Sequence, residues 1–241
     1  MSAELWALVP AAGVGSRMGS AVPKQYLSLG WGTVLAVTLQ QLLATPGLVG
    51  IVVVLAPGDE RFASLPIAQH PNIHVVTGGE ERADSVLSGL EFMRHTLKLA
   101  ENAQVLVHDA ARPCVTQTAI RQLLDEVGNS VAGGILAVPV ADTLKYAAEP
   151  VVNAARIEHT QDRRQLWLAH TPQLFPLGLL SRALRTGLEA GAQLTDEASA
   201  VERLGYQPRL VVDRRDNIKI TQPEDLWLAE QILRRHQELG L

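Results

Sequence analysis

Residues 5–19 read LWALVPAAGVGSRMG, and within them an apolar run passes directly into a glycine-rich segment. The run 5–10 is apolar throughout, which is typical of strands buried on both faces of a parallel sheet. The small residues that follow let a ligand approach the backbone, and successive free N–H groups in such a loop can bind an anion. The stretch therefore predicts a first strand and a loop that either binds phosphate or simply makes a tight turn.

Short apolar runs alternate with amphipathic stretches outward from this segment. Further strands are expected at residues 50–56, 72–78, 104–110 and 133–140, and helices at 33–44, 82–100 and 116–127. Strands that alternate with helices are typical of βαβ units. The pattern predicts an α/β fold of three layers with a mostly parallel sheet. Because no repeat or linker divides the chain, we expect a single domain over residues 1–241.

The second half departs from this alternation between residues 141 and 164. This segment is polar, has few residues able to fill a core, and contains two stretches that could pair as a hairpin. It predicts a β-arm that protrudes from the body. Beyond it the pattern predicts an apolar stretch at 166–175, short strands at 209–213 and 217–220, and helices near 176–190, at 195–204 and from 222 onward. Thr33 and Thr195 are the expected N-caps of their helices.

Composition excludes several classes of protein. The chain has a net charge of -4 and no basic stripe, so a nucleic-acid partner is not expected. Its one cysteine, Cys114, fits a reducing compartment and a small buried side chain better than a nucleophile. No stretch approaches the ~20 apolar residues that span a bilayer, and the N-terminus lacks a signal-peptide pattern. We therefore expect a soluble cytoplasmic protein with no membrane partner.

The first loop carries Arg17, and Lys24 follows it. Met18 stands where a dinucleotide fingerprint G-x-G-x-x-G needs its third glycine, and no Walker A string occurs. A hydride-transfer enzyme and a P-loop NTPase therefore lose support. Two cations beside a glycine-rich loop favour a triphosphate ligand.

Two further charged residues are candidates for a site. Asp109 ends a predicted strand, where ligands of open α/β sheets bind. It could orient a hydroxyl or a hydrated Mg²⁺, or it could cap the following turn. Its neighbour His108 would point to the opposite side of a regular strand and is interpreted as structural. Lys219, inside the apolar run NIKI, indicates either an anionic partner or a solvated edge strand. Arg163 could be solvated, or could reach an anion across a subunit boundary.

Eight motifs occur in one order along the chain: PAAGVGSRMG with PKQY, GGEERADSV, VHDAARP, PVADTLK, HTQDR, HTPQ, TDEASAVE and DNIKIT. In this order they resemble the 2-C-methyl-D-erythritol 4-phosphate cytidylyltransferase family of the non-mevalonate isoprenoid pathway. The resemblance runs from Val9 to the final helix. It implies a Rossmann-like nucleotidyltransferase fold and transfer of CMP from CTP to methylerythritol phosphate, with release of pyrophosphate. It also implies Mg²⁺ held through the CTP phosphates, without a confident protein ligand, and a homodimer joined by the arm 141–164.

The resemblance also implies a role for individual residues. The CTP-binding residues would be Ala11, Ala12, Gly13, Gly15, Gly79, Arg82, Ser85 and Ala110. The catalytic residues would be Arg17, Lys24 and Lys219. The polyol phosphate would be bound by Asp109, Arg112, Thr143, Arg163, Thr171 and Thr195, with Thr143 and Arg163 serving the partner's site.

The chemistry implied by this resemblance needs no general base. The substrate phosphate is already ionised and would attack the α-phosphorus in line, so catalysis is positioning and charge neutralisation. Three alternatives stay open: a ribitol 5-phosphate cytidylyltransferase, a sugar-1-phosphate nucleotidyltransferase that uses UTP or dTTP, and a non-catalytic nucleotide-binding module. The set Arg17, Lys24, Asp109 and Lys219 speaks against the module, because binding alone needs no cations aimed at a reacting phosphorus.

Overall fold

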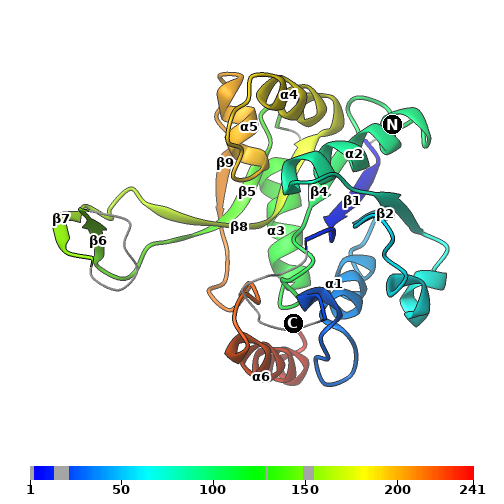
Figure 1. The fold of residues 1–241 in the computed structure, drawn as a ribbon, viewed down its shortest axis with the longest axis horizontal. Coiled ribbons are helices and arrows are strands. Elements are labelled where there is room, and N and C mark those ends of the chain that lie inside the picture. Colours follow the sequence, from blue (N-terminus) through cyan, green and yellow to red (C-terminus); the bar gives the residue numbers. More distant parts are fainter. Residues whose placement is uncertain (1–2, 14–21, 129, 149–154) are drawn as a thin grey trace.

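Strands in the computed structural model, which describes residues 3–13, 22–128, 130–148 and 155–241, form one main sheet in the order β3-β2-β1-β4-β8-β5-β9 (Figure 1). These strands are β1 (Leu5–Pro10), β2 (Leu48–Leu55), β3 (Ile73–Thr77), β4 (Gln104–Val107), β5 (Gly134–Pro139), β8 (Trp167–Pro176) and β9 (Arg209–Val212). Strand β8 runs antiparallel to β4 and β5, whereas the other pairs are parallel. The predicted mostly parallel sheet is confirmed.

Helices cover both faces of this sheet. They are α1 (Val34–Leu43), α2 (Arg82–His95), α3 (Gln117–Val127), α4 (Leu177–Glu189), α5 (Glu197–Arg203) and α6 (Glu224–Leu239). Leu8 of β1 packs in one core cluster with α2, α4 and α5, while Val9 packs in a second cluster with α1 and α3. Each such fully buried aliphatic side chain contributes about 1.5–3 kcal/mol. Alternate residues of a central strand thus pack against helices on the two faces of the sheet. The predicted three-layer fold is confirmed.

Several boundaries differ from the expected ones. Helix α2 ends at His95 rather than at residue 100, and Lys98 just beyond it has a left-handed φ of 56°, which an α-helix cannot accommodate. The N-cap Thr33 is confirmed, since its side chain accepts from the Ala36 N–H. The N-cap Thr195 is wrong: Asp196 caps α5, because its carboxylate accepts from the Ser199 N–H.

The strand predicted at 217–220 is also wrong, since these residues form no strand. They cross the carboxyl ends of the sheet strands instead of extending a ladder. The Ile220 N–H donates to the Ala111 carbonyl, and the Asn217 side chain donates to the Thr171 carbonyl. Both ends of the segment are therefore fastened, and Ile220 packs in a small third core cluster with α1 and α6.

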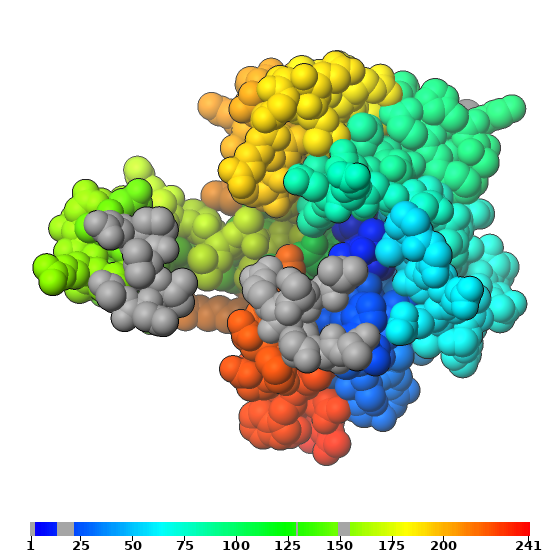
Figure 2. Space-filling model, viewed as in Figure 1, coloured from blue at the N-terminus to red at the C-terminus, as the bar shows by residue number. Residues whose placement is uncertain are grey.

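The predicted hairpin is present as strands β6 (Leu144–Ala147) and β7 (Ile157–Gln161), which pair antiparallel outside the main sheet. It lies to one side of the body, joined to it by the long connections to β5 and β8 (Figure 1). In the space-filling view it forms a separate lobe (Figure 2). Every residue of β7 is exposed, so the hairpin has almost no core within this chain. Among the described helices, none has the length and apolar character needed to cross a membrane.

Candidate active site

A first cavity lies at the carboxyl ends of the parallel strands, where ligands of open α/β sheets bind. Nine predicted site residues line it: Ala11, Ala12, Gly13, Lys24, Arg82, Ser85, Asp109, Ala110 and Lys219. Gly79 lies beside them, and its carbonyl accepts from the Ser85 hydroxyl at 3.5 Å. A Cβ on Gly79 would collide with Asp84 in the first turn of α2, so the approach to this helix requires glycine. Gly15 and Arg17 lie outside the described residues.

A second cavity adjoins the first on the side of β8. Its lining comprises Arg82, Asp109, Arg112, Ala169, His170, Thr171, Gln173, Thr195, Asp196 and Lys219. Arg82, Asp109 and Lys219 line both cavities; we call these three residues the junction. Two ligands bound in adjacent cavities would meet at the junction, which is the arrangement that a group transfer between them requires.

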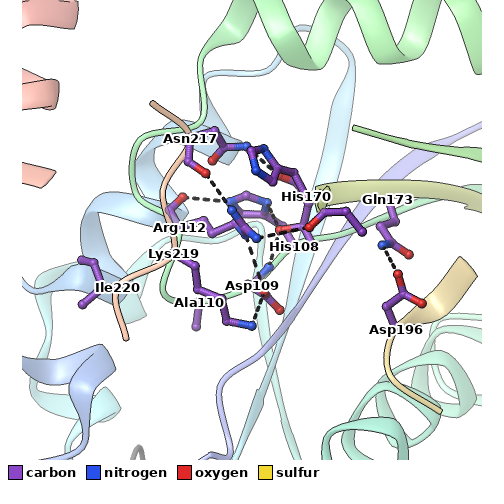
Figure 3. Close-up of polar contacts among 12 residues, drawn as sticks. His108, Asp109, Ala110, Arg112, His170, Gln173, Asp196, Asn217, Lys219 and Ile220 are labelled. Atoms are coloured by element: carbon purple, nitrogen blue, oxygen red, sulfur yellow. Dashed lines mark hydrogen bonds and ion pairs between the residues drawn. The ribbon is translucent and has the colours of Figure 1, made fainter. Parts of the chain in front are cut away.

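The junction is held together by ion pairs on Asp109. Its Oδ2 lies 2.7 Å from Lys219 Nζ and 3.7 Å from Arg112 Nε (Figure 3). Its Oδ1 lies 3.1 Å from Arg82 Nη2. Burial disfavours the charged carboxylate, but the charges of Arg82 and Lys219 outweigh it and hold the pKa of Asp109 well below its ordinary value. Asp109 therefore stays ionised and orients cations rather than taking up a proton.

A buried hydrogen-bond chain supports Asp109 from behind (Figure 3). The Asp109 N–H donates to Thr171 Oγ1 at 3.1 Å, and this hydroxyl is 2.9 Å from His108 Nδ1. His108 Nε2 lies 3.0 Å from the Arg112 carbonyl, which can only accept. Burial lowers the pKa of His108 to about 4, so the neutral ring donates from Nε2 and accepts the Thr171 proton at Nδ1. The structural interpretation of His108 is confirmed.

Arg112 and His170 line the second cavity and are held by buried polar residues. Arg112 Nη1 donates to the Asn217 carbonyl at 2.7 Å, and the Asn217 amide donates to Asp213 at 2.8 Å. Asp213 also lies 2.7 Å from Nδ1 of His170. The roles of His170, Asp213 and Asn217 were missed from the sequence, although HTPQ and DNIKIT contain two of them. Thr195 lines this cavity but is exposed.

Lys24 and Gln25 fasten the glycine-rich side of the first cavity. They belong to a short 3₁₀ helix, η2 (Lys24–Tyr26). Lys24 Nζ donates to the Ile220 carbonyl at 3.0 Å, next to Lys219 in the chain. Buried Gln25 donates to the carbonyls of Ala11 at 2.8 Å and Gly13 at 3.0 Å. Sequence reasoning missed Gln25, because nothing local marks a glutamine that closes a loop fourteen residues away.

Glu197 is a second residue that sequence reasoning missed. It is fully buried, and its Oε1 and Oε2 accept from Arg82 Nη1 at 2.6 Å and Nη2 at 3.1 Å. Burial disfavours the charged guanidinium, but Glu197 and Asp109 outweigh it and raise the pKa of Arg82. The motif TDEASAVE contains Glu197, yet its second acid looks like any acid in the first turn of a helix.

Thr143 and Arg163 are not brought to either cavity within this chain. Both are exposed and lie where the chain enters and leaves the arm. Cys114 is buried, and burial together with the charge of Asp216 raises the pKa of its thiol to about 12. The interpretation of Cys114 as an inert buried side chain is confirmed.

A divalent cation such as Mg²⁺ needs several oxygen ligands around one point. Among the described residues, no group of three or more His, Cys, Asp or Glu side chains could hold a metal. Asp109 lines both cavities, but its two oxygens already face cations. These residues fit an Mg²⁺ that is carried mainly by phosphate and water oxygens, as Mg²⁺ commonly is.

The site combines small residues after β1, flanking lysines and two cavities that meet at one ion-paired carboxylate. This combination is typical of an α/β protein of the nucleotidyltransferase type. The match to known sequences is more specific. The chain matches the family model "IspD: 2-C-methyl-D-erythritol 4-phosphate cytidylyltransferase" over residues 5–235, and it belongs to this family.

Relatives of this family share both sequence and fold with the chain. A 2-C-methyl-D-erythritol 4-phosphate cytidylyltransferase of Escherichia coli O1:K1 is 55% identical over 238 residues, which is 98% of this chain and 97% of that protein. A crystal structure of a 4-diphosphocytidyl-2C-methyl-D-erythritol synthase has 40% identity and a TM-score of 0.83, covering 97% and 99% of the two chains. The enzyme of Francisella tularensis has 34% identity and a TM-score of 0.80, covering 95% and 100%. The resemblance inferred from the eight motifs is confirmed.

Proposed function

We propose that this protein transfers CMP from CTP to 2-C-methyl-D-erythritol 4-phosphate, giving 4-diphosphocytidyl-2-C-methyl-D-erythritol and pyrophosphate. The observation that carries the proposal, beside the family, is the pair of cavities that share Arg82, Asp109 and Lys219. The first cavity would hold CTP against the small residues that follow β1. The second would hold the polyol phosphate.

The reaction is proposed to be an in-line displacement at phosphorus. An oxygen of the polyol phosphate bonds to the α-phosphorus of CTP, and the bond between that phosphorus and the bridging oxygen of pyrophosphate breaks. The attacking phosphate is already an anion, so no residue has to remove a proton. Lys24 and Lys219, which line the first cavity, would neutralise charge on the phosphates as it shifts. Arg17, outside the described residues, would add a third cation.

Binding roles follow the cavities. Ala11, Ala12, Gly13, Arg82, Ser85 and Ala110 are proposed to bind CTP, and Asp109, Arg112, Thr171 and Thr195 to surround the polyol phosphate. Gly79, beside the first cavity, and Gly15, outside the described residues, are proposed to bind CTP as well. Thr171 would act mainly by holding Asp109, since its hydroxyl already accepts the Asp109 N–H. A bound Mg²⁺ would supply further charge neutralisation at the triphosphate.

A homodimer joined by the arm 141–164 is part of the proposal. Tyr146 and Ile157 on the hairpin are 57% and 65% exposed, and an exposed apolar surface of this kind favours a protein partner. Thr143 and Arg163 would then contact the polyol phosphate in the partner's second cavity. A cytoplasmic location is proposed as well, because the one cysteine is free and buried.

The test is pyrophosphate release from CTP in the presence of Mg²⁺. Methylerythritol 4-phosphate, ribitol 5-phosphate and a control without acceptor are compared, with UTP as a competing nucleotide. Release that depends on methylerythritol phosphate is the expected result. Preference for ribitol phosphate would keep the mechanism and change the substrate. Tight CTP binding without release on either acceptor would contradict the proposal.

A further inference from the structure

Glu197 is a buried carboxylate that lines neither cavity, although it contacts a residue of both. Its side chain is 1% exposed, whereas that of its partner Arg82 is 31% exposed. A charge buried to this extent is costly unless it is paired and hydrogen-bonded. Glu197 meets this requirement through its two-point contact with the Arg82 guanidinium. Its side chain therefore meets the cavities through Arg82, which lines both of them.

Both sequence neighbours of Glu197 are hydrogen-bonded to one buried glutamine. The buried side chain of Gln173 on β8 donates to the Asp196 carboxylate at 2.9 Å (Figure 3). It also accepts from the Ala198 N–H at 2.9 Å. Asp196 and Ala198 are the immediate neighbours of Glu197 in the sequence. The start of α5 is thus fastened to a central strand, so Glu197 is presented to Arg82 from a rigid support.

Two carboxylates bind two different edges of the Arg82 guanidinium. Glu197 takes Nη1 and Nη2, while Asp109 takes Nε at 3.2 Å and Nη2 at 3.1 Å. A planar guanidinium bound at three of its nitrogens has one orientation left. Because Arg82 also lines both cavities, that orientation shapes the boundary across which the reacting groups would meet.

We propose that Glu197 is a positioning residue for the transfer reaction: it fixes the Arg82 guanidinium, and through it the Asp109 carboxylate, at the boundary between the two cavities. This inference rests on the proposed function. Without the Glu197 charge, Arg82 would turn entirely toward Asp109 and compete with Lys219 for it. A displacement of the reacting groups by about 1 Å can cost ~10²-fold in rate, so the main effect should fall on turnover.

The test compares Glu197→Gln, which keeps the size and removes the charge, with the wild type and a matched control. The control is Glu224→Gln, because Glu224 is likewise the first residue of a helix and is exposed. Pyrophosphate release is measured while CTP and methylerythritol phosphate are each varied, and rates are expressed per folded molecule from thermal unfolding curves. Glu197→Gln should lower kcat about 10²-fold, with a smaller change in the KM for CTP. Glu224→Gln should match the wild type.

A double-mutant cycle with Arg82→Lys separates positioning from a purely structural role. If Glu197 acts through Arg82, adding Glu197→Gln to Arg82→Lys should cost little further activity. Losses that multiply, or a wild-type kcat in folded Glu197→Gln protein, would overturn the inference. Glu197→Asp keeps the charge but shortens the side chain by one methylene, which loosens the two-point contact with Arg82, so kcat should fall, though less than in Glu197→Gln. If the glutamine variant does not fold, an undiminished kcat in folded Glu197→Asp protein would overturn the inference. An inactive wild type in the same assay would instead contradict the proposed function.

Discussion

The junction and the arm differ in how far their side chains find contacts within a single chain. At the junction, the Asp109 carboxylate has cations at 2.7 Å and 3.1 Å, and a buried network supports it from behind. On the arm, Tyr146 and Ile157 are more than half exposed, and Arg163 lies at the surface. Buried charges persist only when they are paired, so the ion pairs of the junction have to form within one chain. The arm has no such requirement, because water or a partner can cover it.

This contrast separates the expected effects of mutation. Changes around the first cavity and behind the junction should alter turnover or the free energy of unfolding. Changes on the arm should alter substrate affinity and association while the fold of each chain is kept.

Lys24→Ala should have the largest effect on activity. Lys24 lines the first cavity and is fastened to the Ile220 carbonyl. Loss of one such charge-neutralising group should lower kcat by ~10²–10³-fold, with a smaller loss in CTP affinity measured by calorimetry. Arg121→Ala, which removes an exposed cation on α3, serves as the control. Equal losses in kcat and in CTP affinity would mean that Lys24 only binds the nucleotide.

His108→Gln should change how the free energy of unfolding depends on pH. The pKa of His108 is lowered by burial from 6.5 to about 4 in the folded protein, so the unfolded chain binds this proton first. The wild type should be fully stabilised by this group above pH ~6.5 and should lose about 3 kcal/mol of that stability as the pH falls to ~4. The variant should lack this part of the slope, as denaturant unfolding at several pH values can show.

The matched control for this measurement is His95→Gln, because the His95 side chain is 69% exposed. The same pH series is recorded for this variant, so that the loss of a buried histidine is compared with the loss of an exposed one. A slope unchanged in His108→Gln would mean that the neutral His108 ring does not support the junction in the way described.

Arg163→Ala should have the smallest of these effects and should leave the fold intact. Arg163 is exposed and lines neither cavity of its own chain. If it reaches the partner's substrate, its loss should raise the KM for the polyol phosphate about 10-fold, the effect of one charge-assisted hydrogen bond. The melting temperature should not change. An unchanged KM in a protein shown to be dimeric by sedimentation would remove the arm from the site.

Much of the fold could be predicted because its signals are local and periodic. The buried strand of residues 5–10, the alternation of strands and helices, and the polar arm all follow from spacing along the chain. The errors arose where tertiary contacts override such patterns. NIKI has the composition of a strand, yet Asn217 and Ile220 are bonded across the strand ends, so the segment cannot join the sheet. The cap of α5 shifted by one residue because Asp196 also binds Gln173.

The candidate site shows the same division. Residues carried by contiguous motifs, such as Ala11, Arg82 and Asp109, lie on the cavities where the sequence predicts them. Gln25 and Glu197 were missed because each acts through a contact that no local pattern encodes.

Periodicity and ordered motifs are properties of neighbouring residues, so they were enough to establish the layers of this protein and its family. Which charges meet depends on the tertiary structure. Arg82 and Glu197 are 115 residues apart in the chain, and Arg112 and Asn217 are 105 apart. A buried charge without a partner is costly. This cost arises only when folding excludes water from the space around the charge, so only the folded chain favours such pairs.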